Sequence, residues 1–229
     1  MYKGPNFSID CNPMIKPDCK HINNNNKNSI IVSTKDKEKC LPPSCFCEKG
    51  ELIKNEGFEV PGVEPGRVFA DWEALPAPET SVVRTTTNVY QGNSAASIRT
   101  TVFPQPITRS VRLRQNITVT PGCLYSLKFA ERLVSLGNND TALQTLIARI
   151  FYVFQGFQYD LLNITIQKST IDRKYHLHSE KSELPVPCKV SGVIVQFDFF
   201  ITGTGPAEWN LDAVSMRAIS KISACCCKE

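Results

Sequence analysis

Strict alternation of apolar and polar residues recurs in the middle of this 229-residue chain. The clearest runs are residues 111–119, 124–133, 160–167 and 193–201. Successive side chains of a strand point to opposite faces, so each run predicts a half-buried β-strand. The apolar members expected to face a core are Val111, Leu113, Ile117, Val119, Tyr125, Leu127, Phe129, Leu133, Leu162, Ile164, Ile166, Val193, Val195, Phe197, Phe199 and Ile201.

The intervening residues agree with an all-β fold. Residues 144–154 are apolar on both faces, as a central strand can be, and the last strand is expected near 209–219. Turn signals such as Pro121-Gly122 and Gly203-Thr204-Gly205-Pro206 separate the runs. No segment keeps a helical period. Roughly nine to eleven strands are expected, which predicts a two-sheet antiparallel β-sandwich.

The composition divides the chain into three parts. Residues 1–50 contain five prolines, four consecutive asparagines and a charged run from Lys35 to Lys39. Such a segment buries too little apolar surface to offset its ordering entropy, so it predicts a flexible arm. The sandwich is expected over residues 51–219, and residues 220–229 form a short tail.

The cysteines are concentrated at the two ends. Of ten, eight lie in the arm and tail: Cys11, Cys19, Cys40, Cys45, Cys47, Cys225, Cys226 and Cys227. A domain of this length folds without disulfide staples. Neighbouring cysteines pair with each other only under strain, so the run at 225–227 favours bonds to separate partners. We therefore expect these eight residues to form disulfides between chains.

Other roles for the cysteines remain open. Cys123 and Cys188 lie at predicted strand ends, where they could pair with each other or accept an incoming arm. Zinc could be held by cysteines of the arm with His21. This is less favoured, because one residue separates Cys45 from Cys47 and structural zinc sites prefer gaps of ~2–4 residues.

The arm contains one β-prone stretch, made up of Ser29, Ile30, Ile31, Val32, Ser33 and Thr34. An open sandwich has edge strands with unpaired backbone groups, to which such a stretch can add. Addition to a neighbouring copy is head-to-tail and produces filaments. The alternative is that the stretch folds back onto its own domain.

Several function classes find no support in the sequence. The net charge is +4 without a tight Lys/Arg cluster, so no nucleic-acid partner is expected. No stretch approaches the ~20 apolar residues of a membrane span, and the N-terminus lacks the apolar core of a secretory signal. No nucleophile motif is visible, so no catalytic residue is expected. His176 and His178 share one strand face, which favours an exposed polar face over a metal pair.

The β region carries an ordered set of signposts. They are the segments Glu51–Glu59 (ELIKNEGFE), Trp72, Gln91–Ala96, Gln115–Gly122 with Tyr125, and Trp209–Val214 (WNLDAV). Over about residues 51–219 this set resembles the jelly-roll carbohydrate-binding modules of families 4, 9 and 22. Their pattern opens with N-G-x-F-E and closes with l-D-D-v. Here the opening reads Asn55-Glu56-Gly57-Phe58-Glu59, and the closing pair is Asp212-Ala213.

The resemblance implies a jelly-roll topology and two kinds of site. Glu59 and Asp212 match positions around a structural calcium, although strand-end hydrogen bonds would explain them equally well. No other cofactor is expected. Sugar binding in these modules uses exposed aromatic rings, for which this chain offers Trp72, Tyr90, Tyr152, Phe157, Tyr159 and Tyr175. Trp72 and Trp209 match structural positions of the modules.

The arrangement of the cysteine-bearing ends resembles the subunits of bacterial endospore appendages, which are pilus-like fibres. It implies a structural subunit that self-assembles into a disulfide-linked fibre or coat. We expect the protein on a spore or cell surface, made without a classical signal peptide, with itself as main partner and spore-surface proteins or glycans as further ones. The alternative is a carbohydrate-binding module anchored through its cysteine-rich ends.

Overall fold

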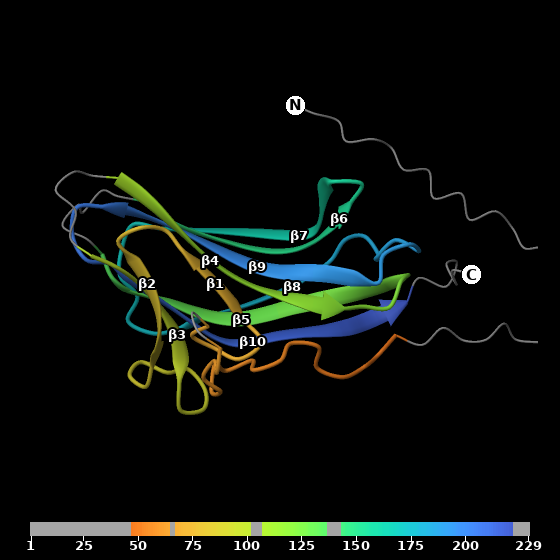
Figure 1. Cartoon of the computed structure of the whole chain (residues 1–229), viewed down its shortest axis with the longest axis horizontal. Helices are drawn as coiled ribbons and strands as arrows, with labels where there is room; N and C mark the ends of the chain where they lie inside the picture. Colours follow the sequence, from red (N-terminus) through yellow and green to blue (C-terminus); the bar gives the residue numbers. More distant parts are fainter. Residues whose placement is uncertain (1–46, 65–66, 102–106, 137–142, 222–229) are drawn as a thin grey trace, which may run out of the picture. The chain divides into compact units, whose positions relative to one another are not determined.

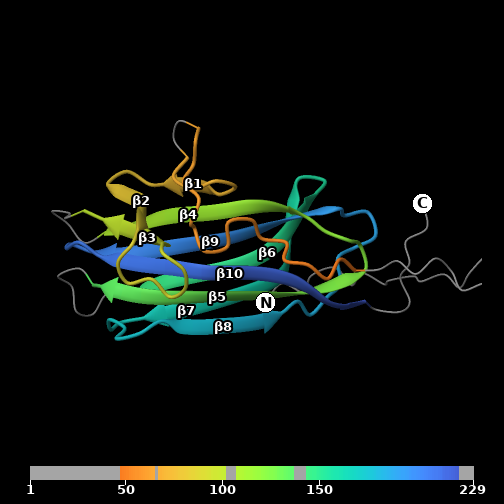
Figure 2. The same cartoon turned by 90° about the horizontal axis from the view of Figure 1, so that it is seen from below.

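A computed structural model describes residues 47–64, 67–101, 107–136 and 143–221. These residues form ten β-strands in two five-stranded sheets. They contain no helix long and apolar enough to cross a membrane. Figures 1 and 2 show the two sheets packed face to face.

Each sheet has a strand order that differs from the order in the chain. The first sheet consists, in spatial order, of β1 (Glu73–Pro76), β4 (Ile107–Thr118), β9 (Gly192–Gly203), β6 (Gln144–Phe154) and β7 (Phe157–Lys168). The second consists of β2 (Thr80–Thr85), β3 (Ala95–Thr100), β10 (Glu208–Lys221), β5 (Cys123–Ser135) and β8 (His176–Lys181). All of these neighbours pair antiparallel. The predicted jelly-roll sandwich is confirmed.

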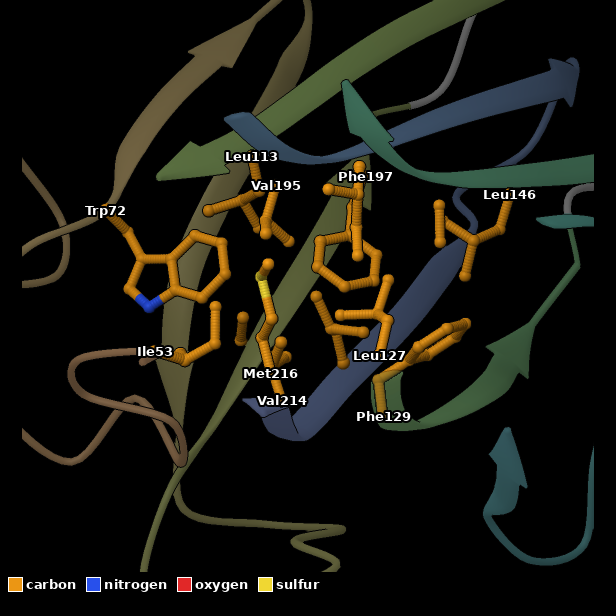
Figure 3. Packing of buried hydrophobic residues seen from close by; sticks show 14 of the residues in the cluster. Ile53, Trp72, Leu113, Leu127, Phe129, Leu146, Val195, Phe197, Val214 and Met216 are labelled. Atoms are coloured by element: carbon orange, nitrogen blue, oxygen red, sulfur yellow. The ribbon is translucent and has the colours of Figure 1, made fainter. Parts of the chain in front are cut away.

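The core lies between the sheets, where the alternation placed it. Figure 3 shows side chains from both sheets interdigitating. The first sheet contributes Leu113, Leu146, Val195 and Phe197, and the second contributes Leu127, Phe129, Val214 and Met216, all fully buried. Burying each large apolar side chain stabilises the fold by ~1.5–3 kcal/mol. The faces turned away from this core are therefore where a functional surface must be sought.

The segment before β1 closes one end of the core. Ile53 and Trp72 pack against the strands in Figure 3, and the indole Nε1 of Trp72 donates a hydrogen bond to the carbonyl of Asn55 at 3.2 Å. Glu51 ties this segment to β10, since its Oε1 accepts from Met216 N at 2.7 Å. Val214 N donates to the carbonyl of Glu56 at 2.9 Å, next to a β-bulge in β10. The signpost segments at the two ends of the sandwich thus meet in space.

The β6–β7 hairpin extends beyond the first sheet. The pairing of β6 with β9 ends at Phe151, after which β6 pairs with β7 alone. The turn consists of Gln155 and Gly156, both with positive φ (51° and 82°), as expected of a two-residue hairpin turn that matches strand twist. In Figure 1 the hairpin rises away from the sandwich. It therefore stands as a wall at one end of the outer face of the first sheet.

Candidate functional site

A row of polar side chains crosses the outer face of the first sheet from edge to edge. Glu73 lies opposite Arg114, which lies opposite Gln196 on the next strand. Gln196 lies opposite Arg149, and Arg149 lies opposite Asn163. Their neighbours along each strand face the core, so this row points outward. We call the outward-facing side chains of this sheet the polar face.

The centre of the polar face is a buried ion cluster. Asp198 is only 3% exposed, although it points away from the core. Its carboxylate accepts from Arg112 Nε at 2.8 Å, from Gln196 Nε2 at 2.7 Å and from Arg149. Burial by itself would raise the pKa of Asp198, but these hydrogen bonds outweigh it and hold the pKa below its ordinary value. The cluster fixes two guanidinium groups in place.

Arg149 is the member with spare hydrogen-bonding capacity. Its Nε is buried and has no hydrogen-bond partner among the described residues. Its guanidinium carbon lies 5.6 Å from the ring centroid of Phe151, two residues further along the same strand. The Arg149 side chain is 21% exposed, so a polar ligand on this face can contact its guanidinium group.

A stacked aromatic pair lies in the β6–β7 hairpin, and one of its rings, Tyr152, also packs against the core. Tyr152 and Tyr159 stack at the base of the hairpin, with ring centroids 5.2 Å apart and planes 16° from parallel. A groove of about 280 Å³ runs along the hairpin, lined by Asn116, Ile117, Thr118, Tyr152, Val153, Gly192, Val193 and Ile194. Apolar ring surface next to fixed donors and acceptors suits a ligand with one apolar face and polar edges.

The other predicted aromatic platforms lie elsewhere. Trp72 and Trp209 are fully buried and belong to the core. Phe157 is 68% exposed at the hairpin tip. Tyr90 and Tyr175 pair with each other beside the second sheet, with centroids 5.6 Å apart. The candidate aromatics are therefore divided among three locations, the core, the hairpin and the Tyr90–Tyr175 pair, and of these residues Tyr152 lines the groove beside the polar face.

Glu59 and Asp212, the residues matched to a calcium position, lie near each other. A Cβ built on Gly57 would lie 3.7 Å from Glu59 Oε1 and 3.8 Å from Asp212 Oδ1. Glu59 accepts from Asn93 N and Ser94 N, and Asp212 from the backbone N–H groups of Tyr90, Gln91 and Ala213. Burial raises the pKa of Asp212, and the charge of Glu59 adds to that rise.

These carboxylates fit calcium only in part. Two close negative charges favour a hard cation, which carboxylate and carbonyl oxygens prefer. Each oxygen of the pair already accepts a hydrogen bond, however. In the part of the chain that the structure describes, no three His, Cys, Asp or Glu side chains gather as a metal site. Backbone carbonyls and water would have to complete the shell, so calcium here stays a prediction.

The cysteine assignments change at one position. The prediction of an intermolecular disulfide is wrong for Cys47. Its sulfur forms a disulfide with Cys123 of the same chain, with the two Cα atoms 5.9 Å apart. The fully buried Cys123 thus accepts the arm in cis. The strand end is held by its backbone: Gly122 N donates to the carbonyl of Val186 at 2.7 Å, and Val186 N donates to the carbonyl of Cys123 at 3.0 Å.

Cys188 is disulfide-bonded as well, and its partner is neither Cys47 nor Cys123. The alternative that Cys123 and Cys188 pair with each other is therefore wrong. Outside the described residues lie the segment Ser29–Thr34 and the remaining intermolecular candidates Cys11, Cys19, Cys40, Cys45, Cys225, Cys226 and Cys227.

His176 and His178 lie on β8 and contact different carboxylates. His176 Nε2 is 3.1 Å from Asp172 Oδ1, and His178 Nε2 is 3.0 Å from Glu131 Oε1. The ring of His178 also stacks on Phe129 at 5.0 Å. Each histidine therefore has a carboxylate partner of its own.

Sequence reasoning missed the polar face. Arg112, Arg149, Gln196 and Asp198 occupy the polar positions of alternating strands, which are normally solvated and carry no signal. One hint existed: Gln196 and Asp198 are the only polar residues in the run from Val193 to Ile201. A carboxylate within so apolar a strand needs partners, yet their identity depends on strands distant in sequence.

Comparison with known proteins identifies the fold and goes no further. No protein-family profile matches the sequence, and no curated protein sequence matches it. Among solved structures, TmCBM61 in complex with β-1,4-galactotriose is similar with a TM-score of 0.52 at 14% identity, over 74% of this chain and 99% of that one.

Two further structures are similar at the same level. The CBM22-1-CBM22-2 tandem domain of Paenibacillus barcinonensis Xyn10C has a TM-score of 0.50 at 14% identity, over 79% of this chain and 48% of that chain. The enzymatically active domain of the tailspike protein 4 of bacteriophage CBA120 has a TM-score of 0.51 at 11% identity, over 74% of this chain and 21% of that chain. The chain has the jelly-roll fold of carbohydrate-binding modules, as its signposts predicted.

Proposed function

We propose that this protein binds a carbohydrate on the polar face of its first sheet. The observation that carries the proposal is the row from Glu73 to Asn163, which crosses all five strands beside a groove that Tyr152 helps to line. A sugar presents hydroxyl groups at its rim and C–H groups on its faces. Planar amides, guanidinium groups and carboxylates recognise the hydroxyl groups, and aromatic rings recognise the C–H faces.

The size of the face suits a short oligosaccharide. Five strands are separated by four spacings of ~4.8 Å, so the row is ~19 Å long. The groove along the hairpin wall adds about 280 Å³ at one side of it. Several sugar units fit along such a row, each within reach of a different strand. The fold comparison supports this function, since two of the similar structures are carbohydrate-binding modules.

Binding is tested first with a glycan array and then by calorimetry on the best soluble oligosaccharide. We expect Arg149→Ala and Tyr152→Ala to weaken binding about 10-fold or more, because each removes a contact worth ~1.4 kcal/mol or more. Lys128→Ala is the matched control. Lys128 is an exposed cation on β5 of the other sheet, and its loss should leave affinity unchanged. Equal affinities in the natural protein and the three variants, or no binding to any glycan of the array, would reject this site.

A second candidate function is self-assembly into a disulfide-linked fibre or coat on a spore or cell surface. It is favoured by β7, which is 12 residues long and, among the described strands, pairs only with β6. Long free edges invite strand addition. Beside this edge runs a groove of about 490 Å³, lined by Asp160, Leu161, Leu162, Asn163, Ile164, Glu180, Lys181 and Glu183.

The charge of the groove suits the stretch Ser29–Thr34 of a neighbouring copy. The groove has three carboxylates and one lysine, whereas Lys27, Lys35 and Lys37 flank that stretch. The test is gel electrophoresis with and without reductant, with electron microscopy alongside. Ladders that collapse to one band on reduction, together with filaments, support assembly. A monomer under oxidising conditions contradicts it and leaves carbohydrate binding untouched.

A further inference from the structure

A buried charge cluster joins the two sheets on the side where β7 and β8 lie. Glu131 of β5 is completely buried, and both of its carboxylate oxygens contact the ammonium of Lys168 at the end of β7, at 2.7 and 2.8 Å. The same ammonium contacts Asp172 Oδ2. The side chains of Lys168 and Asp172 are only 12% and 10% exposed. A lysine and two carboxylates thus share a site from which water is nearly excluded.

The two carboxylates have different surroundings. Glu131 Oε2 accepts from the indole Nε1 of Trp209 at 2.9 Å, and Oε1 lies 3.0 Å from His178 Nε2. Burial would raise the pKa of Glu131, but the hydrogen bonds from His178 and Lys168 outweigh it and lower the pKa. Both carboxylate oxygens of Glu131 face the amine, and this position allows Glu131 to take a proton from it.

Asp172 is instead surrounded by groups that withdraw electron density. Its Oδ2 accepts from Leu133 N at 2.7 Å, and its Oδ1 lies 3.1 Å from His176 Nε2. Its own N–H donates to the carbonyl of Leu133 at 2.8 Å, which fixes the backbone. The backbone N–H on Oδ2, with the imidazole of His176 close to Oδ1, can polarise the carboxyl group and stabilise charge that develops there during nucleophilic attack.

We propose that Lys168 and Asp172 condense spontaneously to an isopeptide bond, with Glu131 as general base. Nothing external is needed, because the ammonium and the carboxylate together contain the atoms of one amide and one water. Proximity of this kind is equivalent to ~10⁵–10⁸ M of reactant. A desolvated lysine amine is an established type of protein nucleophile. The reaction also removes two opposite charges from a buried site, where charge is costly.

The condensation moves two protons from Nζ to a carboxylate oxygen and releases one water. Glu131 takes one proton from the Lys168 ammonium, and the free lone pair of Nζ attacks Cγ of Asp172. Oδ2 remains as the amide oxygen and keeps its hydrogen bond from Leu133 N. Oδ1, which faces His176, leaves. It departs as water with two of the three ammonium protons, both passed through Glu131, and the third stays on the amide nitrogen.

The cross-link would fasten the end of β7. Lys168 is its last residue, and Asp172 is pinned to β5 through Leu133. An amide between them ties a long edge strand of the first sheet to the second sheet through one covalent bond and two backbone contacts. Glu131 retains its charge and its bonds to Trp209 and His178. The edge would then resist fraying when load or heat is applied.

Tryptic mapping of the reduced and alkylated protein gives a direct test. Cleavage at Arg149, Lys168 and Arg173 releases Ile150–Lys168 and Ser169–Arg173 as two peptides. The isopeptide bond blocks cleavage at Lys168, so a single peptide Ile150–Arg173 should appear. It should be about 18 Da lighter than its sequence, the mass of the water lost. If folded protein that has been kept for days at neutral pH still gives the two separate peptides, the proposal is overturned.

Three variants separate the roles. Glu131→Gln keeps the size of the side chain but removes the base, and should give the two separate peptides. Asp172→Asn should react with loss of ammonia, about 17 Da, and give the same product mass as the natural protein. Lys174→Arg, an exposed neighbour, should leave the link intact. Circular dichroism shows whether Glu131→Gln is folded, and the mass of the natural protein decides the question even if it is not.

Discussion

Removing the Cys47–Cys123 disulfide should cost more stability than any single change at the surface. The bond joins residues 76 positions apart and is formed by a buried sulfur at Cys123. The perturbation is the double change Cys47→Ser with Cys123→Ala. Changing both positions avoids a free thiol that could pair wrongly with the other cysteines. Alanine at 123 leaves no unpaired polar group in the buried site.

The magnitude follows from the closed loop. Cross-linking a loop of this length removes ~15 cal/mol/K of chain entropy from the unfolded state, which is ~4.5 kcal/mol at 25 °C. For a domain of this size each kcal/mol shifts the melting temperature by ~2–4 °C, so a fall of ~9–18 °C is expected. Because Cys47 precedes Glu51, the change should also loosen the segment that closes the core around Trp72.

The assay is chemical denaturation followed by tryptophan fluorescence, with calorimetry in parallel. Both tryptophans are buried in the core and report on its opening. Reductant should lower the midpoint of the natural protein strongly and that of the double variant much less. A double variant within ~1 kcal/mol of the natural protein would refute the reasoning, since the loop would then contribute no entropy of the predicted size.

Three further predictions concern carboxylates. The pKa values of Asp198 and Glu131 lie below their ordinary 3.8 and 4.5, so their stabilisation is present above those values and is lost as the pH falls toward the folded-state pKa. The melting temperature should therefore decrease as the pH falls below ~4, and it should decrease less in Asp198→Asn. A melting temperature that does not depend on pH in this range contradicts this. If calcium binds Glu59 and Asp212, it should raise the melting temperature, a chelator should reverse the rise, and Glu59→Gln should abolish it. A melting temperature of the natural protein that does not change with calcium rejects the site. Glu51→Ala should cost ~2–3 kcal/mol in denaturant midpoints, because its carboxylate accepts from the backbone and side chains of β10, and a loss under ~0.5 kcal/mol would contradict that role.

The strands could be read from the sequence because alternation is a local property. Leu113, Phe129 and Phe197 face the core as their spacing predicted. The run 144–154 forms β6, which lies between β9 and β7; its buried and half-buried side chains alternate from Gln144 to Ile150, so one face of the strand packs in the core and the other belongs to the polar face. The signposts at Glu51 and Trp209 indicated the jelly roll because they belong to segments that close one core.

The sites depended on contacts that no local pattern contains. Arg112 and Asp198 are 86 positions apart and meet only because β4 pairs with β9. Lys168 reaches Glu131 across the two sheets in the same way. Cys47 was grouped with the arm because its neighbours in sequence are polar and prolines, and only the fold places it beside Cys123.

Carbohydrate binding on the polar face can be located residue by residue. The most direct measurement is to map chemical shifts of the ¹⁵N-labelled protein during titration with β-1,4-galactotriose and with the best oligosaccharide from the array. Binding on the polar face should shift the side-chain amides of Gln196 and Asn163 first, together with the backbone of the hairpin that contains Tyr152. Shifts confined to the region of Tyr90 and Tyr175, or no shifts with any glycan, would contradict it.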